Sequence, residues 1–150
     1  ARTAALALPG VDAARDARLR EVHFGEFDGQ NVEKNRLHPL FQEWAETPWS
    51  TPAPGGESFA DVARRGLAWL SELPEDANVL AFSHSVFVRS LVCVLLGLKV
   101  EARDGWTFPF PLSLAHASLT RLARHRGEWA LEVFSDTAHL EPWAAGLLDV

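Results

Sequence analysis

The stretch from Asn78 to Gly97 reads NVLAFSHSVFVRSLVCVLLG and predicts the fold class. Residues 78–82 form an apolar run of strand length, and residues 86–96 are apolar on most sides, as in a buried helix. Gly97 is a typical residue at the end of such a helix. A buried strand that leads through a polar turn into a buried helix favours an α/β fold. We therefore expect a mostly parallel sheet covered by helices on both faces.

The polar turn Ser83-His84-Ser85 between these two elements is the first candidate site. Ligands of open α/β sheets bind at the edge where the strands end. The first N–H groups of a helix, together with the helix dipole, also attract phosphate. We therefore expect His84 to face an anionic ligand and Ser85 to donate its hydroxyl to it. A histidine that only closes a turn is an equally good interpretation of the position.

Upstream of this stretch the chain predicts two helices separated by a loop. Ser58 is a typical N-cap, and Asp61 three residues later completes a capping-box pattern before apolar residues recur at helical spacing up to Leu73. Residues 31–46 also have helical character, with Leu37 and neighbouring apolar residues on one stripe. Residues 47–56 contain three prolines and two glycines and predict a loop.

The two ends of the chain carry weaker signals. Residues 1–8 are typical of the end of a helix, which Pro9 and Gly10 terminate. Residues 118–124 and 128–134 predict a β-hairpin, because apolar and polar residues alternate in the second segment.

Three acidic residues, Glu21, Glu26 and Asp28, lie in one glycine-punctuated segment. Spacing alone does not choose among them, although Asp28 beside Gly29 is most simply a turn residue. Further along, Arg36 is a candidate for holding a substrate. An exposed arginine on a helix is the simpler interpretation of that position.

Composition limits the classes of function. The 150 residues, with 47% hydrophobic and 23% charged residues, fit one globular domain spanning residues 1–150. No apolar run reaches the roughly 18 residues of a membrane span, so no membrane is expected. The net charge of −6 argues against a nucleic-acid partner. The single cysteine, Cys93, excludes a disulfide framework and favours a cytoplasmic protein in which this thiol is packed.

Several common catalytic motifs are absent from the sequence. No two histidines have the i, i+4 spacing of a zinc helix, and one cysteine cannot form a thiolate site, so no metal is expected. The chain has no Gly-x-Ser-x-Gly elbow and no phosphate-binding glycine loop, which argues against a serine hydrolase and a nucleotide-binding fold. Among the other histidines, His23 and His139 flank apolar residues and are candidates for core groups.

Taken in order, these segments resemble the histidine phosphatase superfamily, whose members include phosphoglycerate mutases and broad phosphatases. The matching segments are Ala1–Ala4, Leu19–Gly29, Pro54–Ser58, Phe82–Arg89, Ala115–Ser118 and Asp136–Leu140. Ser85 stands where the family usually has glycine, and His116 stands where asparagine is more frequent. The resemblance extends over nearly the whole chain.

The resemblance implies phosphoryl transfer through a phosphohistidine. Glu21 would be the general acid/base, His84 the second histidine of the pocket, and the partner a small phosphorylated substrate, with no cofactor. The family's nucleophile lies in an Arg-His-Gly motif on its first strand, and this chain contains no such motif. We therefore expect residues 1–150 to be an N-terminally incomplete part of a longer polypeptide.

Two functional alternatives remain open beside a phosphatase. Hydrolysis of a small phosphomonoester is favoured over mutase chemistry, because residues 29–55 offer little material for a lid that shields the phosphohistidine from water. A relative without the nucleophile would instead be a non-catalytic binding or scaffold protein. The sequence indicates neither the substrate nor the oligomeric state.

Overall fold

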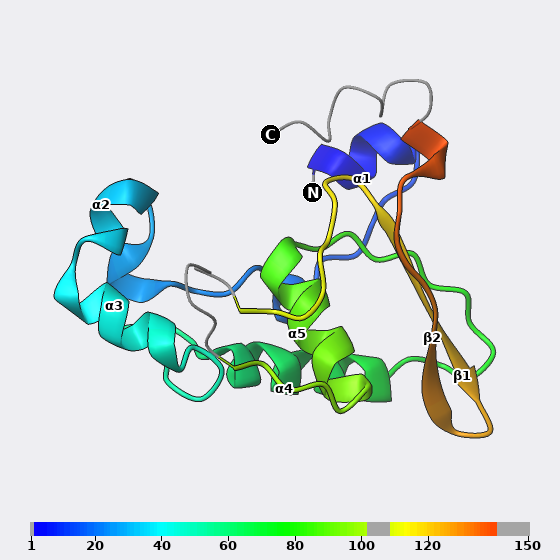
Figure 1. The fold of residues 1–150 in the computed structure, drawn as a ribbon. Coiled ribbons are helices and arrows are strands. Elements are labelled where there is room, and N and C mark those ends of the chain that lie inside the picture. Colours follow the sequence, from blue (N-terminus) through cyan, green and yellow to red (C-terminus); the bar gives the residue numbers. More distant parts are fainter. Residues whose placement is uncertain (1, 102–108, 141–150) are drawn as a thin grey trace.

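The computed structural model describes residues 2–101 and 109–140. Its helices and strands are α1 (Arg2–Ala7), α2 (Val32–Arg36), α3 (Pro39–Glu46), α4 (Phe59–Ser71), α5 (Ser85–Leu95), β1 (Leu119–His125) and β2 (Glu128–Asp136). Short 3-10 turns lie at Ala17–Leu19, Gly25–Phe27 and Ala138–Leu140. In Figure 1, α4 and α5 lie at the centre, between the hairpin of β1 and β2 on one side and an arm made of α2 and α3 on the other.

Helix α4 begins at the predicted capping box. The Ser58 hydroxyl accepts a hydrogen bond from the Asp61 N–H at 3.1 Å, and the Asp61 carboxylate accepts one from the Ser58 N–H at 3.0 Å. These bonds satisfy donors that have no partner within the helix. About two turns after Ser58, Gly66 lets α5 approach closely, because a Cβ atom there would lie 3.1 Å from a methyl carbon of Leu91. The capping box and this glycine together fix where α4 begins and how closely it packs on α5.

The capping box makes stability depend on pH. Hydrogen bonds from the Ser58 hydroxyl, the Arg64 guanidinium and the Ser58 N–H lower the pKa of Asp61 from 3.8 to about 2. Because the folded-state pKa lies below the unfolded one, the contribution is fully present above about pH 4 and is lost as the pH falls toward about 2. We expect the melting temperature of Asp61→Asn to fall less than that of the wild type over this interval. Circular dichroism melts would check this, with the exposed Asp12→Asn as control. Parallel curves for Asp61→Asn and the wild type would refute the assignment.

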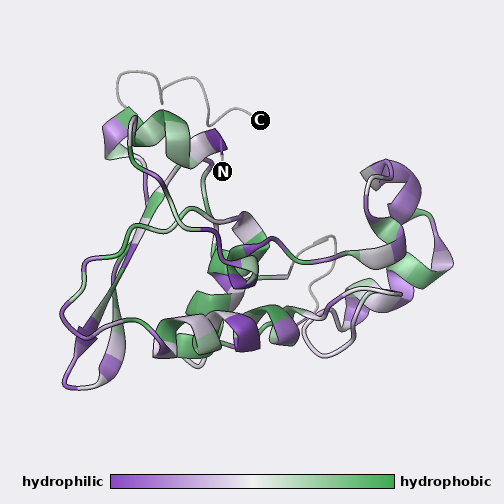
Figure 2. Cartoon of the chain, turned by 180° about the vertical axis from the view of Figure 1, so that it is seen from behind, coloured by the Kyte–Doolittle hydropathy of each residue, from purple (hydrophilic) through white to green (hydrophobic). Residues whose placement is uncertain are grey.

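Aromatic side chains form the core between α4 and the arm. Phe59 is fully buried, and its ring stacks on Phe110 at 5.0 Å and meets the edge of Trp44 at 5.8 Å. Phe27 and Phe41 extend the cluster into the arm, with ring centroids 5.1 Å apart. The cluster anchors the arm to the centre of the molecule, although its outer helix α2 is mainly hydrophilic (Figure 2).

The helix predicted over residues 31–46 is two helices. It breaks at Leu37 and His38, because proline at the next position has no N–H to donate and disfavours helical geometry in the residue before it. His38 has extended backbone angles and caps α3 by accepting the Leu40 N–H. The predicted apolar stripe is therefore only partly buried. Leu37 is 80% exposed, whereas Phe41 and Trp44 are buried.

The hairpin is confirmed, but the mostly parallel sheet is not. Among the described residues the one sheet consists of β1 and β2, which pair antiparallel around a turn at Arg126 and Gly127. Residues 78–82, predicted to be a strand, are not in this sheet. Val79 and Leu80 are 49% and 57% exposed. A strand of this apolar composition is buried only when neighbouring strands and helices cover it. None of the described strands pairs with residues 78–82.

The remaining helical predictions are confirmed within a residue or two. Helix α1 ends before Gly10, and α5 ends before Gly97, both of which have positive φ. No helix in the described part of the chain has the length and apolar character that crossing a membrane requires.

Candidate active site

The N-terminus of α5 positions His84. This residue is the N-cap of the helix, with φ −132° and ψ 167°, and its exposed side chain makes no capping hydrogen bond. The neighbouring Ser83 hydroxyl donates to the carbonyl of Leu19 at 2.8 Å. This bond attaches the turn before α5 to the segment that carries Glu21. The imidazole is therefore held at a helix end while its polar atoms remain accessible.

Glu21 lies against the same helix end. Its carboxylate accepts hydrogen bonds from the N–H groups of Val86 and Phe87, each at 3.1 Å, and from the N–H of Val22 at 2.9 Å. The first N–H groups of a helix have no partner within it, and the dipole favours a negative charge there. The structure thus joins Glu21 to the first turn after His84, although the two residues are far apart in sequence.

The structure distinguishes the three acids that spacing left equivalent. Glu26 is exposed, and its N–H donates to the carbonyl of Pro54. Asp28 accepts the N–H of Phe24 at 3.1 Å and lies 3.6 Å from the imidazole of His23. Glu21, by contrast, binds the first turn of α5 through its carboxylate. His23 and His139, the two candidates for core histidines, are both exposed.

The expected anion site at the start of α5 is partly occupied by the protein itself. Two of the N–H groups that were expected to be available for phosphate already donate to Glu21. A carboxylate satisfies these donors for the same electrostatic reason that a phosphate would. Ser85, the first residue of the helix, is half-buried next to His84. Its role as a substrate ligand stays a prediction.

Arg36 is not brought to this site. It is the last residue of α2, where its exposed guanidinium pairs with Glu33 of the same helix at 3.0 Å. Figures 1 and 2 both show α2 at the outer end of the arm, well away from α5. A contribution of Arg36 to substrate binding stays a prediction, and neither its pairing with Glu33 nor its place on the arm supports it.

Arg89 is a half-buried cation one turn after Ser85. Its guanidinium carbon lies 4.5 Å above the centre of the Phe110 ring, and its Nε donates to the Ser85 carbonyl at 3.3 Å. Burial lowers the pKa of Arg89, and the negative charge of Glu21 opposes this change. In the sequence this residue stood out only as the end of the Phe82–Arg89 motif. Its spacing of one helical turn from Ser85 is the signal that places it on the side of the site.

Two glycines allow the segment around Glu21 to cross the loop before α4. The N–H of Glu26 donates to the Pro54 carbonyl at 2.9 Å, and the N–H of Glu57 donates to the His23 carbonyl at 2.8 Å. At this crossing a Cβ atom on Gly25 would overlap the Pro54 carbonyl oxygen, and one on Gly56 would overlap the His23 carbonyl oxygen. Both positions therefore require glycine.

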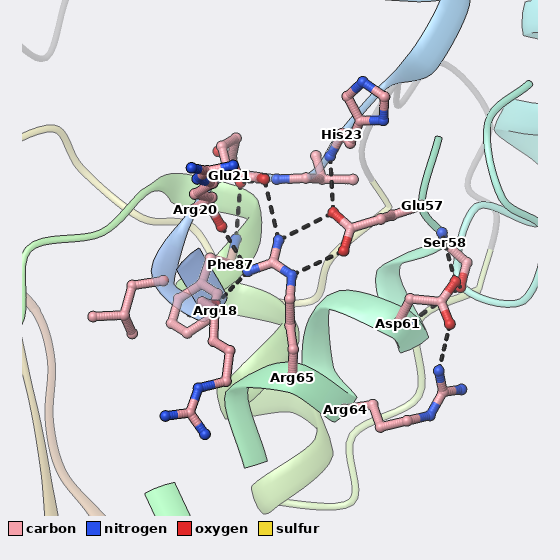
Figure 3. A network of polar contacts seen from close by, with 12 residues as sticks. Arg18, Arg20, Glu21, His23, Glu57, Ser58, Asp61, Arg64, Arg65 and Phe87 are labelled. Atoms are coloured by element: carbon pink, nitrogen blue, oxygen red, sulfur yellow. Dashed lines mark hydrogen bonds and ion pairs between the residues drawn. The ribbon is translucent and has the colours of Figure 1, made fainter. Parts of the chain in front are cut away.

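A network around Arg65 lies beneath Glu21 and was not predicted from the sequence (Figure 3). The Arg65 guanidinium pairs with the Glu57 carboxylate at 2.9 Å and donates to main-chain carbonyls of the segment carrying Glu21. Burial raises the pKa of Glu57, but hydrogen bonds from Arg65 and the His23 N–H outweigh it and hold the pKa below its usual value.

Neither the cysteine nor the shallow cavity near it belongs to this site. Cys93 is fully buried, which confirms the prediction of a packed thiol, and this burial raises its pKa to about 11. A hollow of about 330 Å³ lies between Trp49, Cys93 and the residues that follow α5, at the opposite end of the helix from His84. In the described part of the chain, no group of three or more histidine, cysteine or acidic side chains is arranged to hold a metal ion.

Comparison with known proteins identifies the family. The model of the histidine phosphatase superfamily (branch 1) matches residues 1–137. The chain belongs to this superfamily. The match confirms the resemblance inferred from the sequence motifs, and it includes Glu21, His84 and the hairpin.

Curated relatives in the histidine phosphatase superfamily include probable phosphoglycerate mutases GpmB. The protein from Yersinia enterocolitica is 31% identical over 144 residues, which cover 88% of this chain and 63% of the relative. The protein from Yersinia pestis (strain Pestoides F) is 29% identical with the same coverage. The chain thus spans 63% of the length of these relatives.

Several solved structures share the fold of this chain. Bacillus stearothermophilus YhfR superposes with a TM-score of 0.71 at 24% identity, covering 85% of this chain and 63% of that one. A mycobacterial glucosyl-3-phosphoglycerate phosphatase complexed with VO3 superposes with a TM-score of 0.63 at 28% identity, covering 85% and 65%. The same phosphatase with inorganic phosphate superposes with a TM-score of 0.61 at 27% identity, covering 81% and 63%.

Proposed function

We propose that this chain supplies part of the active site of a phosphatase that hydrolyses a small phosphomonoester through a phosphohistidine. The observation that carries the proposal is the meeting of Glu21 with the first turn of α5, directly after His84. An acid and an accessible imidazole at one helix end are two of the groups that such a reaction requires, beside the nucleophile. The related phosphatase structures that contain inorganic phosphate and VO3 also support the proposal.

In the first step a nitrogen of the nucleophilic histidine, which is not His84, attacks phosphorus. A P–N bond forms and the P–O bond to the leaving group breaks. Glu21, in its protonated form, donates its proton to the leaving oxygen. The cationic form of His84 stabilises the negative charge on the equatorial phosphoryl oxygens. To reach the leaving group, the Glu21 side chain would exchange its hydrogen bonds with Val86 and Phe87 for contact with the substrate.

In the second step water attacks phosphorus, the P–N bond breaks and inorganic phosphate leaves. The Glu21 carboxylate takes the proton from the attacking water and so returns to its starting state. The covalent intermediate divides one difficult transfer into two easier ones. Glu21 thus acts as acid in the first step and as base in the second.

We also propose that the nucleophilic histidine belongs to polypeptide outside residues 1–150, which would make these residues an incomplete domain. No Arg-His-Gly motif occurs among the 150 residues, and the chain spans 63% of the length of its curated relatives. That polypeptide would supply a strand beside residues 78–82 and complete a mostly parallel sheet. The exposure of Val79 and Leu80 supports this arrangement, because apolar strand residues are normally covered.

Mutase chemistry is the second candidate, because the curated relatives are named as probable phosphoglycerate mutases. Hydrolysis is favoured by the direction of the α2–α3 arm. Figures 1 and 2 show the arm extending sideways rather than over the start of α5. A mutase must shield its phosphohistidine from water. A non-catalytic scaffold remains the alternative if the nucleophile is absent from the whole polypeptide. The cytoplasmic location of the protein stays a prediction.

The test is an assay of the full-length polypeptide that contains residues 1–150. We expect it to hydrolyse p-nitrophenyl phosphate in the presence of EDTA, and to retain acid-labile, base-stable phosphate after a rapid quench, as a phosphohistidine does. Transfer of phosphate from 2,3-bisphosphoglycerate to monophosphoglycerate faster than its release to water would favour the mutase. Phosphate or vanadate binding without turnover or labelling would overturn the enzyme proposal and favour the scaffold.

A further inference from the structure

The guanidinium group of Arg65 uses all five of its N–H donors. Its Nε donates to Glu57 at 2.9 Å, and one Nη donates to the other Glu57 oxygen at 3.2 Å and to the Glu21 carbonyl at 3.1 Å. The second Nη donates to the carbonyl of Arg20 at 2.8 Å and to that of Arg18. An arginine has five such donors in a fixed planar fork. Every donor therefore has a partner, and three of the five bind the main chain just before or at Glu21.

Glu57 binds the main chain on the C-terminal side of Glu21, at His23. Besides pairing with Arg65, its carboxylate accepts the N–H of His23 at 3.0 Å, and its own N–H donates to the His23 carbonyl. The main chain is thus held on both sides of Glu21, from Arg18 to His23. Figure 3 shows the guanidinium lying between the Glu57 carboxylate and the carbonyl groups of this segment. Since only 17% of the Arg65 side chain is exposed, water competes weakly for these bonds.

The hydrogen-bond partners of the Arg65 side chain lie outside helix α4, so these bonds do not stabilise the helix itself. Its neighbour Arg64 pairs with Asp61 one turn earlier on the same helix, and its side chain is 74% exposed. Arg65 instead joins α4 to the segment carrying Glu21 and to α5, because its guanidinium carbon also lies 5.5 Å from the centre of the Phe87 ring. Phe87 is one of the residues whose N–H binds the Glu21 carboxylate.

We propose that Arg65, together with Glu57, is a positioning residue for Glu21. Arg65 and Glu57 hold the main chain around Glu21, while N–H groups at the start of α5 donate to its side-chain carboxylate. This inference rests on the proposed function, in which Glu21 is the general acid/base. Arg65 itself is not a catalytic residue, because its donors are directed at the protein and not at the reacting atoms.

The test uses Arg65→Lys and Glu57→Gln, with Arg64→Lys as the matched control on the same helix. Lysine keeps the charge but has no planar fork, so it cannot bind Glu57 and three carbonyls together. The first readout is hydrogen–deuterium exchange of the Val86 and Phe87 amides in the full-length protein. The second is kcat and KM for p-nitrophenyl phosphate across pH. The melting temperature of each variant shows that it is folded.

We expect Arg65→Lys to speed exchange of the Val86 and Phe87 amides several-fold relative to the last turn of α5. We also expect it to lower kcat by about 10- to 100-fold, as a small misplacement of a reacting group does, with KM nearly unchanged. Glu57→Gln should also speed amide exchange and lower kcat, both by less than Arg65→Lys does. Arg64→Lys should have neither effect. Unchanged exchange at these two amides in folded Arg65→Lys and Glu57→Gln would overturn the inference. A wild type without turnover would refute the proposed function, and the exchange data alone would then decide the role of Arg65.

Discussion

Replacement of Glu21 by glutamine is expected to lower kcat for a phosphomonoester by about 10²- to 10⁴-fold, the range measured for lost general acid–base catalysis. Glutamine has nearly the same shape but can neither give a proton to the leaving oxygen nor take one from water. The loss should be smaller for a substrate with a good leaving group, because such a group departs without protonation. Comparing p-nitrophenyl phosphate with an alkyl phosphate would measure this difference.

The same substitution has a structural effect that must be separated from the chemical one. The two carboxylate oxygens of Glu21 accept three N–H groups, whereas a glutamine side chain turns its NH₂ toward at least one of them. A hydrogen bond to a charged group is worth about 1.5–3 kcal/mol, so the free energy of unfolding should fall by about that amount. Glu26→Gln, in the same segment but exposed, is the control. If both variants kept wild-type kcat for the alkyl ester, Glu21 would not be the acid.

Replacement of His84 by alanine is expected to lower kcat by about 10²- to 10³-fold, as the loss of one preorganised donor does. The melting temperature should change little, because the exposed imidazole makes no capping hydrogen bond. A large loss of rate with wild-type stability would therefore separate a catalytic role from a structural one. His125→Ala, at the end of β1, is the control. A His84→Ala variant that melts earlier but turns over normally would support the interpretation that His84 only closes a turn.

The sequence predicted the elements whose signals are local. The capping box of Ser58 and Asp61 is read within four positions, and the apolar run of α5 ends at a glycine that stops helices. The hairpin follows from alternation and its turn. Residues 78–82 have an equally clear strand pattern, but a sheet depends on pairing with distant strands. None of the described strands pairs with residues 78–82, so the local pattern was insufficient.

The site was predicted only in part, for the same reason. The family resemblance singled out both His84 and Glu21, whereas spacing alone left Glu21 equivalent to Glu26 and Asp28. The contact of the Glu21 carboxylate with the first turn of α5 had no signal in the sequence. Arg65 gave no signal at all, because its main partners are backbone carbonyls 44 to 47 positions earlier. Any residue type supplies such a carbonyl, so the sequence carries no trace of the interaction. Even the break between α2 and α3 was marked only by Pro39, inside an otherwise helical pattern.

The crossing at Gly25 and Gly56 limits how this molecule can change. When two side chains clash, a smaller residue at the second position can relieve the first. Here each added Cβ atom would meet main-chain atoms, which every amino acid has. No substitution elsewhere can therefore compensate for a side chain at either glycine. Variation or redesign around the acid-bearing segment has to keep both glycines and use the neighbouring exposed positions, such as Glu26 and Asp28.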